Sequence, residues 1–192
     1  MRELLKFLDL LHQLQLVKRA VLARAENRYE NDLEHSYQLA MTGWYIVAKE
    51  SLDLNVVRII QYALVHDVVE AYAGDTPTYS GNREEQARRE SRALAKLREK
   101  FPEFRELHQA TEEYEKRDSR ESKFVYALDK LLPILINYQD GGRNWKSNGI
   151  TLAMLLKHKT KDISLSPEVQ KYYDQIVERL RESERDLFKN AE

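Results

Sequence analysis

The sequence predicts an all-α protein, and three observations support this. The chain has only 6 Gly and 4 Pro in 192 residues and is rich in Leu, Glu, Lys, Arg and Ala, which favour helices. Its apolar residues mostly recur three or four positions apart, the spacing of a helix with one buried face. No internal repeat, low-complexity tract or Pro/Ser-rich linker interrupts it. We therefore expect a single helical domain over residues 1–192.

Several helix ends carry local signals. Asn31, followed by Glu34 three residues later, resembles a capping box and predicts a helix start. Gly74 suits a left-handed stop, and Gly141-Gly142 predict the end of another helix. The predicted helices are 2–25, 32–51, 54–73, 83–100, 103–115, 119–139, 145–158 and 167–188.

Charge and composition exclude several classes of partner. The 31 Lys and Arg nearly balance the 32 Asp and Glu, so no broad field attracts nucleic acid or an anionic membrane, and phosphate recognition must be local. Without cysteine, His and carboxylate are the metal ligands available. Residues 1–9 carry charges among their leucines, so we expect neither a secretory leader nor a membrane span. A cytoplasmic protein without nucleic-acid or membrane partners is expected.

Asp129 is acidic where helical spacing predicts an apolar residue. The apolar residues of 124–135 mark one helix face, and Asp129 lies within that stripe. Leaving an ion unpaired in an apolar interior costs roughly several kcal/mol, so a positive group should face it. Arg or Lys is the simple partner and a metal ion the more specific one. Other polar residues set against apolar stripes favour the metal.

Three ionisable residues interrupt the otherwise apolar segment 59–72. On a regular helix, His66, Asp67 and Glu70 share an arc of about 100°. Each alone would more often be a satisfied core group, but three on one face indicate a site. His35, one turn into the helix that starts at 32, is the fourth candidate ligand. Two imidazoles and two carboxylates suit one divalent ion, with Mn, Fe, Co, Ni and Zn fitting better than Ca and Mg also open.

These residues resemble a known family. His35, the adjacent pair His66-Asp67 and the distant Asp129 match the H…HD…D pattern of the HD-domain metal-dependent phosphohydrolases. A bare His-Asp pair is a weak motif, but HDxxE followed by GDxPT in residues 66–78 is specific and looks like the 5'-deoxynucleotidase branch. The resemblance spans roughly residues 15–140.

The resemblance implies a helical-bundle enzyme that hydrolyses the phosphate ester of a nucleoside 5'-monophosphate. One divalent ion is expected on the four matched residues, deoxynucleotides are the expected substrates, and a homodimer is expected by the same analogy. Glu70 matches the catalytic acidic position, and Asp75 matches a second position that assists the leaving group. Which of the two performs which proton transfer is open, and their ordinary interpretations are an Arg partner and a helix cap.

Two further positions concern the substrate. By resemblance Arg19 is the arginine that contacts the phosphate, and its fork geometry suits a dianion. Ala20 follows it, where bacterial nucleotidases carry a bulky aromatic residue near the sugar, so the choice between ribose and deoxyribose stays open. Thr76 is a candidate substrate contact or a plain turn residue before Pro77.

Two other functions remain open from the sequence. A phosphodiesterase or pyrophosphohydrolase acting on another nucleotide would use the same metal set with a different pocket. A non-catalytic nucleotide-binding module would keep the metal without turnover. Glu70 and Asp75 argue against the binding module, since a sensor does not need groups that transfer protons.

Overall fold

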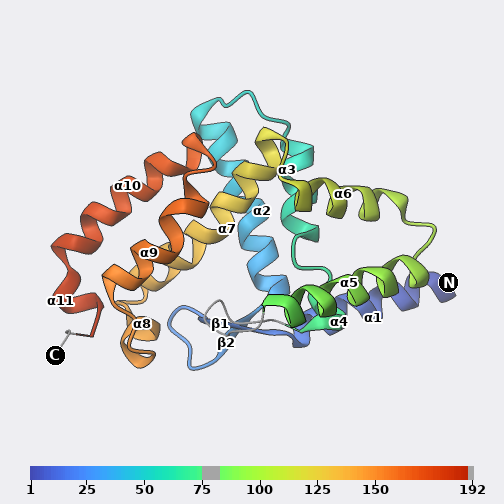
Figure 1. Ribbon diagram of the computed structural model, residues 1–192, viewed down its shortest axis with the longest axis horizontal. Helices are drawn as coiled ribbons and strands as arrows, with labels where there is room; N and C mark the ends of the chain where they lie inside the picture. Colours follow the sequence, from blue (N-terminus) through green and yellow to red (C-terminus); the bar gives the residue numbers. More distant parts are fainter. Residues whose placement is uncertain (75–82, 190–192) are drawn as a thin grey trace. The chain divides into compact units, whose positions relative to one another are not determined.

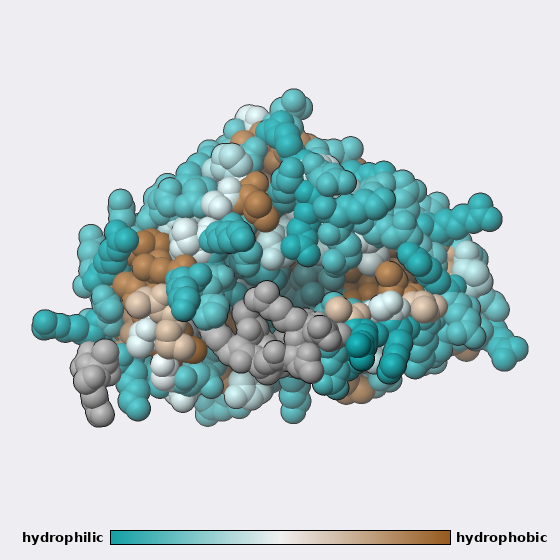
Figure 2. Space-filling model, viewed as in Figure 1, coloured by the Kyte–Doolittle hydropathy of each residue, from teal (hydrophilic) through white to brown (hydrophobic). Residues whose placement is uncertain are grey.

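The computed structural model describes residues 1–74 and 83–189 and confirms the helical class (Figure 1). The chain forms two compact units, Met1–Ala20 with Tyr29–Lys116 and Val21–Arg28 with Arg117–Glu192. A single domain over the whole length stays a prediction. The face in Figure 2 is largely hydrophilic with smaller hydrophobic areas. Within the described residues, no helix has the length and apolar character needed to cross a bilayer.

The first unit is built around the packing of α2 on α3. Helix α1 also packs on α2 and on the short helix α4, while α6 packs on α3 and α5 on α4. Leu39, Ile59 and Leu97 are almost fully buried and form part of this core. The helices are α1 (Arg2–Leu16), α2 (Asp32–Glu50), α3 (Val56–Val65), α4 (Glu70–Ala73), α5 (Arg83–Lys100) and α6 (Arg105–Lys116).

The second unit is built around α7, which packs on α9 and α10. Phe124, Leu128 and Leu131 line the buried face of α7 and are fully inaccessible to solvent. This is the apolar stripe that the sequence predicted around Asp129. The helices are α7 (Arg120–Gln139), α8 (Arg143–Ser147), α9 (Leu152–Ile163), α10 (Pro167–Glu182) and α11 (Glu184–Leu187).

The prediction of one helix over 2–25 was wrong. Helix α1 ends at Leu16, and the chain continues as β1 (Lys18–Leu22), which pairs with β2 (Tyr29–Asn31). Only residues 23–28 connect the two strands, a length that permits an antiparallel hairpin but no parallel crossover. Strand pairing outcompetes the local helical pattern here and places Arg19 on a strand.

The predicted helix 54–73 is interrupted. Helix α3 ends at Val65 and α4 begins at Glu70, with a turn between them. Within the turn, the amide of Val68 donates to the Val65 carbonyl at 3.1 Å and the amide of Glu70 to the Asp67 carbonyl at 2.9 Å. These i→i+3 bonds are tighter than those of an α-helix, so the regular helical wheel assumed for the site does not apply.

Two further predicted helices are divided, while the predicted helix-end signals hold. Segment 145–158 forms parts of α8 and α9, and segment 167–188 forms α10 and α11. The capping box of Asn31 and Glu34 is present at the start of α2. Gly74, Gly141 and Gly142 all have positive φ. At Gly142 a Cβ would also overlap the backbone carbonyl of Leu187, the last residue of α11. Glycine is therefore required there both by its positive φ and by this close contact.

Asp140 and Arg143 fasten the hairpin loop 23–28 within the second unit. The amide of Ala25 donates to Asp140 Oδ1 at 3.0 Å, and Arg143 Nε donates to Asp140 Oδ2 at 2.9 Å. Arg143 Nη1 also donates to the Asn27 side chain at 2.8 Å. Burial raises the pKa of Asp140, but the amide and the guanidinium outweigh it and hold that pKa below its ordinary value of 3.8.

Replacing Asp140 with Ala should lower the free energy of unfolding by about 1–2 kcal/mol near neutral pH, because its hydrogen bonds with the Ala25 amide of the loop and with the Arg143 side chain are lost. Since the folded pKa is lowered, this contribution is complete above the ordinary value of 3.8 and is lost as the pH falls through the folded value. Urea unfolding should therefore show the gap between wild type and variant shrinking below about pH 4.

The matched control is Asp174, an exposed residue of α10 that accepts a hydrogen bond from Gln170 at 2.6 Å. Asp174→Ala should change the free energy of unfolding by less than about 0.5 kcal/mol. A gap for Asp140→Ala that stayed constant between neutral and acid pH would contradict the role assigned to its carboxylate.

Candidate metal centre

The capping box at the start of α2 fixes the position of His35. Asn31 Oδ1 accepts from the amide of Glu34 at 3.0 Å, and Glu34 Oε2 accepts from the amide of Asn31 at 3.1 Å. Both ends of this turn are thereby locked, and His35, the next residue, is completely buried. The imidazole is held on the inner side of α2 in the first unit.

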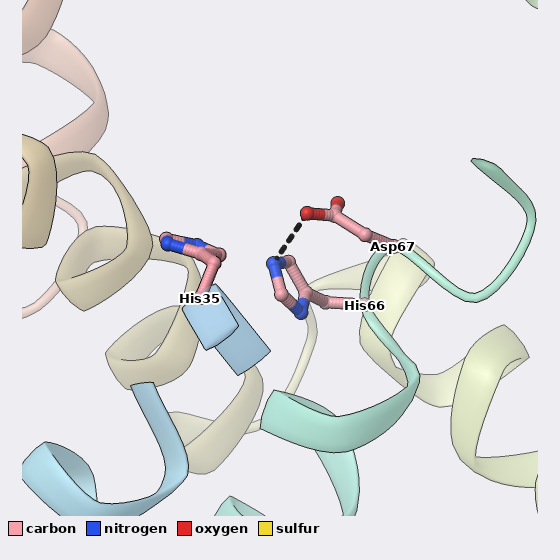
Figure 3. Close-up of side chains that lie close together, drawn as sticks. All are labelled: His35, His66 and Asp67. Carbon is pink, nitrogen blue, oxygen red and sulfur yellow. Dashed lines mark ion pairs between the residues drawn. The ribbon is translucent and has the colours of Figure 1, made fainter. Parts of the chain in front are cut away.

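His66 and Asp67 follow the last turn of α3 and meet His35. One ligand atom from each of the three residues lies within 4.8 Å of the others (Figure 3). The two imidazole centroids are 5.2 Å apart, and His66 is only 5% exposed. The structure thus brings together three of the four predicted ligands, two of them buried. This happens although the helix that was expected to align His66 and Asp67 is broken there.

The hydrogen bond of His66 determines which ring nitrogen can act as a ligand. His66 Nδ1 lies 2.9 Å from the Ala63 carbonyl oxygen, which can only accept, so Nδ1 carries the proton. Nε2 then points at Asp67 Oδ2, 2.8 Å away. A nitrogen lone pair and a carboxylate oxygen this close need a proton or a cation between them. This arrangement fits a divalent metal held by both residues.

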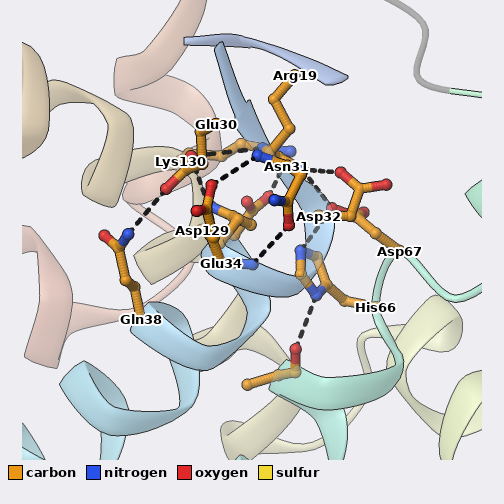
Figure 4. A network of polar contacts seen from close by, with 12 residues as sticks. Arg19, Glu30, Asn31, Asp32, Glu34, Gln38, His66, Asp67, Asp129 and Lys130 are labelled. Atoms are coloured by element: carbon orange, nitrogen blue, oxygen red, sulfur yellow. Dashed lines mark hydrogen bonds and ion pairs between the residues drawn. The ribbon is translucent and has the colours of Figure 1, made fainter. Parts of the chain in front are cut away.

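Arg19 reaches the same carboxylate from β1. Its Nη1 lies 2.6 Å from Asp67 Oδ2 and 3.2 Å from Asp32 Oδ1, and both contacts are partly buried (Figure 4). The residue predicted to contact phosphate therefore lies beside a predicted metal ligand. The phosphate contact itself stays a prediction.

Glu70 belongs to a second group of acidic residues. Carboxylate oxygens of Asp32, Asp67 and Glu70 lie within 4.8 Å of one another, and Asp67 is common to both groups. Glu70 starts α4 directly after the turn that carries Asp67. The structure places Glu70 beside Asp67, and its catalytic role stays a prediction.

Sequence reasoning missed Glu30 and Asp32, which are 2% and 1% exposed. Glu30 precedes α2, so no helical periodicity marks it as inward-facing. Asp32 is the first residue of α2 and lies on the same buried stripe as His35 and Leu39, so helical spacing could have indicated it. If a strand had been predicted at 29–31, the alternation of side chains between its two faces would have indicated that Glu30 and Tyr29 point in opposite directions; Glu30 is buried and Tyr29 is exposed. That signal was not available, because the strand itself was not predicted.

Three predicted residues, Asp129, Asp75 and Thr76, remain to be located. Asp129 is buried on α7 in the second unit, and Lys130 Nζ lies 2.7 Å from its Oδ2. Lys130 therefore supplies the positive group that was expected to face the Asp129 carboxylate. The role of Asp129 as a metal ligand stays a prediction. Asp75 and Thr76 lie outside the described residues.

A family model described as the HD domain matches residues 11–170. The chain belongs to the HD domain family. The 5'-deoxynucleotidase HDDC2 of Bos taurus is 39% identical over 138 residues, 70% of this chain and 66% of that protein. The human protein of the same name is 38% identical over the same shares. The match thus spans just under two thirds of these curated relatives.

Solved structures confirm the HD domain fold. A predicted metal-dependent phosphohydrolase from Magnetospirillum magnetotacticum MS-1 superposes with a TM-score of 0.81 at 29% identity, covering 94% of this chain and 92% of that chain. A protein from Pyrococcus horikoshii OT3 matches with a TM-score of 0.66 at 23% identity, which supports the fold alone. The family resemblance identified from the H…HD…D pattern is confirmed.

Asp67→Ala should weaken divalent-metal affinity of this HD domain by at least about 100-fold, since loss of a mere supporting residue typically costs about 10–100-fold. It should also lower the melting temperature, because Arg19 and His66 lose their shared carboxylate. Elemental analysis of the purified protein and thermal unfolding measure the two effects.

Asp53→Ala is the control, since Asp53 is exposed in the same unit, ahead of α3. It should leave metal content at the wild-type value. Equal metal content in Asp67→Ala and wild type would remove Asp67 from the ligand set.

Proposed function

We propose that this HD domain is a divalent-metal-dependent phosphohydrolase that removes phosphate from nucleoside 5'-monophosphates, with deoxynucleotides preferred. The observation that carries the proposal is the convergence of His35, His66 and Asp67, with the Arg19 guanidinium on the same carboxylate. The names of the HDDC2 relatives and of the Magnetospirillum structure support the reaction class.

One divalent ion is proposed, held by His35, His66, Asp67 and Asp129. When bound, it would acidify a water molecule and polarise a phosphoryl oxygen, the two things that hydrolysis of a phosphate ester requires at neutral pH. The mixed nitrogen and oxygen donors suit Mn, Fe, Co, Ni or Zn, and Mg is also to be tested.

The chain's own residues would bind the phosphate and move protons. Arg19 supplies N–H donors arranged as a fork, which matches a phosphate dianion. Glu70 lies within the acidic group beside Asp67, where it would orient water or accept its proton. Asp75 is proposed to assist the leaving group, and Thr76 to contact the substrate.

The proposal includes a homodimer in the cytoplasm. Four large side chains are exposed on α2, namely Tyr37, Met41, Trp44 and Tyr45. Their spacing places them on one helix face, and such a face favours an interface over solvent. The near balance of charge supports a small-molecule substrate in place of nucleic acid or a membrane surface.

Release of inorganic phosphate from ribo- and deoxyribonucleoside 5'-monophosphates, each with Mg, Mn, Fe, Co, Ni or Zn, tests the proposal directly. Phosphate should be released from monophosphates after metal is added to EDTA-treated protein, with deoxynucleotides turned over faster. Activity confined to cyclic or pyrophosphorylated nucleotides would replace the nucleotidase with another HD reaction. Metal binding without any turnover would favour a nucleotide-binding module.

Glu70→Gln should lower kcat by about 10²–10⁴-fold, because a group that transfers or orients a proton is replaced by a neutral amide of the same size. Metal content should stay at the wild-type level, since Glu70 is not a proposed ligand. Steady-state phosphate release and elemental analysis provide the two readings.

The control is Glu112→Gln, which changes an exposed glutamate paired with Arg98 at 2.6 Å. This variant should retain wild-type kcat. Full activity of Glu70→Gln on every substrate that the wild type hydrolyses would show that Glu70 takes no part in proton transfer.

A further inference from the structure

Glu30 is a buried carboxylate beside the metal centre that the proposed mechanism does not use. It lies in the middle of β2, and its side chain is 3% exposed. Burying a carboxylate is unfavourable unless polar or charged groups compensate it. The groups that surround Glu30 therefore indicate what it is there to hold.

Three polar side chains face the two oxygens of Glu30. Gln38 Nε2 donates to Oε1 at 3.0 Å. The other oxygen, Oε2, lies 3.6 Å from His35 Nδ1 and 3.8 Å from Arg19 Nε. These last two are ion-pair distances, slightly longer than hydrogen bonds. One carboxylate thus touches both a predicted metal ligand and the predicted phosphate-binding arginine.

The local fold explains why Glu30 is held over His35. Glu30 immediately precedes Asn31, the residue that caps α2, so the capping box fixes the direction from which the chain enters the helix. Gln38 lies one helical turn beyond His35 and reaches back to Glu30. The carboxylate is therefore anchored at Oε1, and Oε2 is left to face the imidazole and the guanidinium.

A carboxylate in this position determines the tautomer of a neutral imidazole. An oxygen that can only accept favours a proton on Nδ1, and Nε2 then keeps its lone pair for a metal. The Ala63 carbonyl favours the same Nδ1–H tautomer for His66. Both imidazoles would then present Nε2 as the ligand atom.

We propose that Glu30 is a positioning residue, which sets His35 as the Nδ1–H tautomer and holds the Arg19 guanidinium in place. The inference rests on the metal site of the proposed function, but not on the identity of the substrate. Glu30 is not itself proposed as a ligand of the metal or of the phosphate.

The first test reads the tautomer without metal. Long-range ¹H–¹⁵N NMR spectra of EDTA-treated protein, at a pH where the imidazoles are neutral, should show His35 protonated at Nδ1. In Glu30→Gln the amide can rotate to offer a donor or an acceptor, so the preference should weaken and Nε2–H should be detected. A wild-type His35 protonated at Nε2 would overturn the proposal.

The second test reads metal affinity. Calorimetric titration with Mn²⁺ or Co²⁺ should give about tenfold weaker binding for Glu30→Gln, and up to about 100-fold weaker binding for Glu30→Ala. The Co²⁺ absorption spectrum should change in both variants, because the orientation of His35 changes. A merely structural Glu30 would lower the melting temperature of the EDTA-treated protein and leave affinity and spectrum unchanged, which would overturn the proposal.

Glu34→Gln is the matched control, because glutamine also completes a capping box and Glu34 adjoins His35. It should keep the wild-type tautomer and metal affinity; losses equal to those of Glu30→Gln would overturn the assignment to Glu30. If Glu30→Gln does not fold, Gln38→Ala tests the same role by removing the anchor of Oε1. Metal affinity should then fall less than tenfold but measurably, and an unchanged affinity would count against the proposal.

These readings are separate from the test of the proposed function. Wild-type protein that binds Co²⁺ with the expected tautomer but releases no phosphate would refute the nucleotidase and leave the role of Glu30 standing. If Glu30→Gln released phosphate at the wild-type rate with unchanged metal affinity and tautomer, the role of Glu30 would be refuted and the nucleotidase would stand.

Discussion

The site depends on the need to compensate the charge of buried carboxylates. Glu30, Asp32 and Asp67 all lie within 3.8 Å of the Arg19 guanidinium, which is itself largely shielded from solvent. In such surroundings an ion is stable only with close, well-directed partners. Each member of the cluster therefore restricts the others, and the hairpin, the first turn of α2 and the turn after α3 must come together for any of them to be satisfied.

The break between α3 and α4 contributes directly to the metal centre. In a regular helix, adjacent side chains such as those of His66 and Asp67 leave the axis about 100° apart. The tightened turn after Val65 instead brings Asp67 Oδ2 to 2.8 Å from His66 Nε2. The pairing of these two residues with His35 therefore forms from a turn and does not depend on the continuous helix that the sequence predicted.

The elements that the sequence predicted correctly are those encoded locally. Helical periodicity and the capping box of Asn31 and Glu34 involve residues within a turn or two of one another. The hairpin was missed because five-residue β1 gains its stability from pairing with β2, which no local pattern records. The convergence of His35, His66 and Asp67 was predictable, since ionisable groups in apolar stripes need common partners. Glu30 was not predictable, because it lies on the unpredicted strand β2. Asp32 was missed although it lies on the buried stripe of α2, three residues before His35.

The strand also clarifies what Ala20 can affect. Successive side chains of a strand point to opposite faces, and β1 follows this rule, since Arg19 is partly buried while Lys18 and Ala20 are exposed. A larger side chain at position 20 would therefore leave β1 on the face opposite to the Arg19 cluster. The residue at position 20 therefore does not contribute to the contacts of Arg19 with Asp32 and Asp67. Any influence of this position on the choice of sugar must act from the opposite face of the strand.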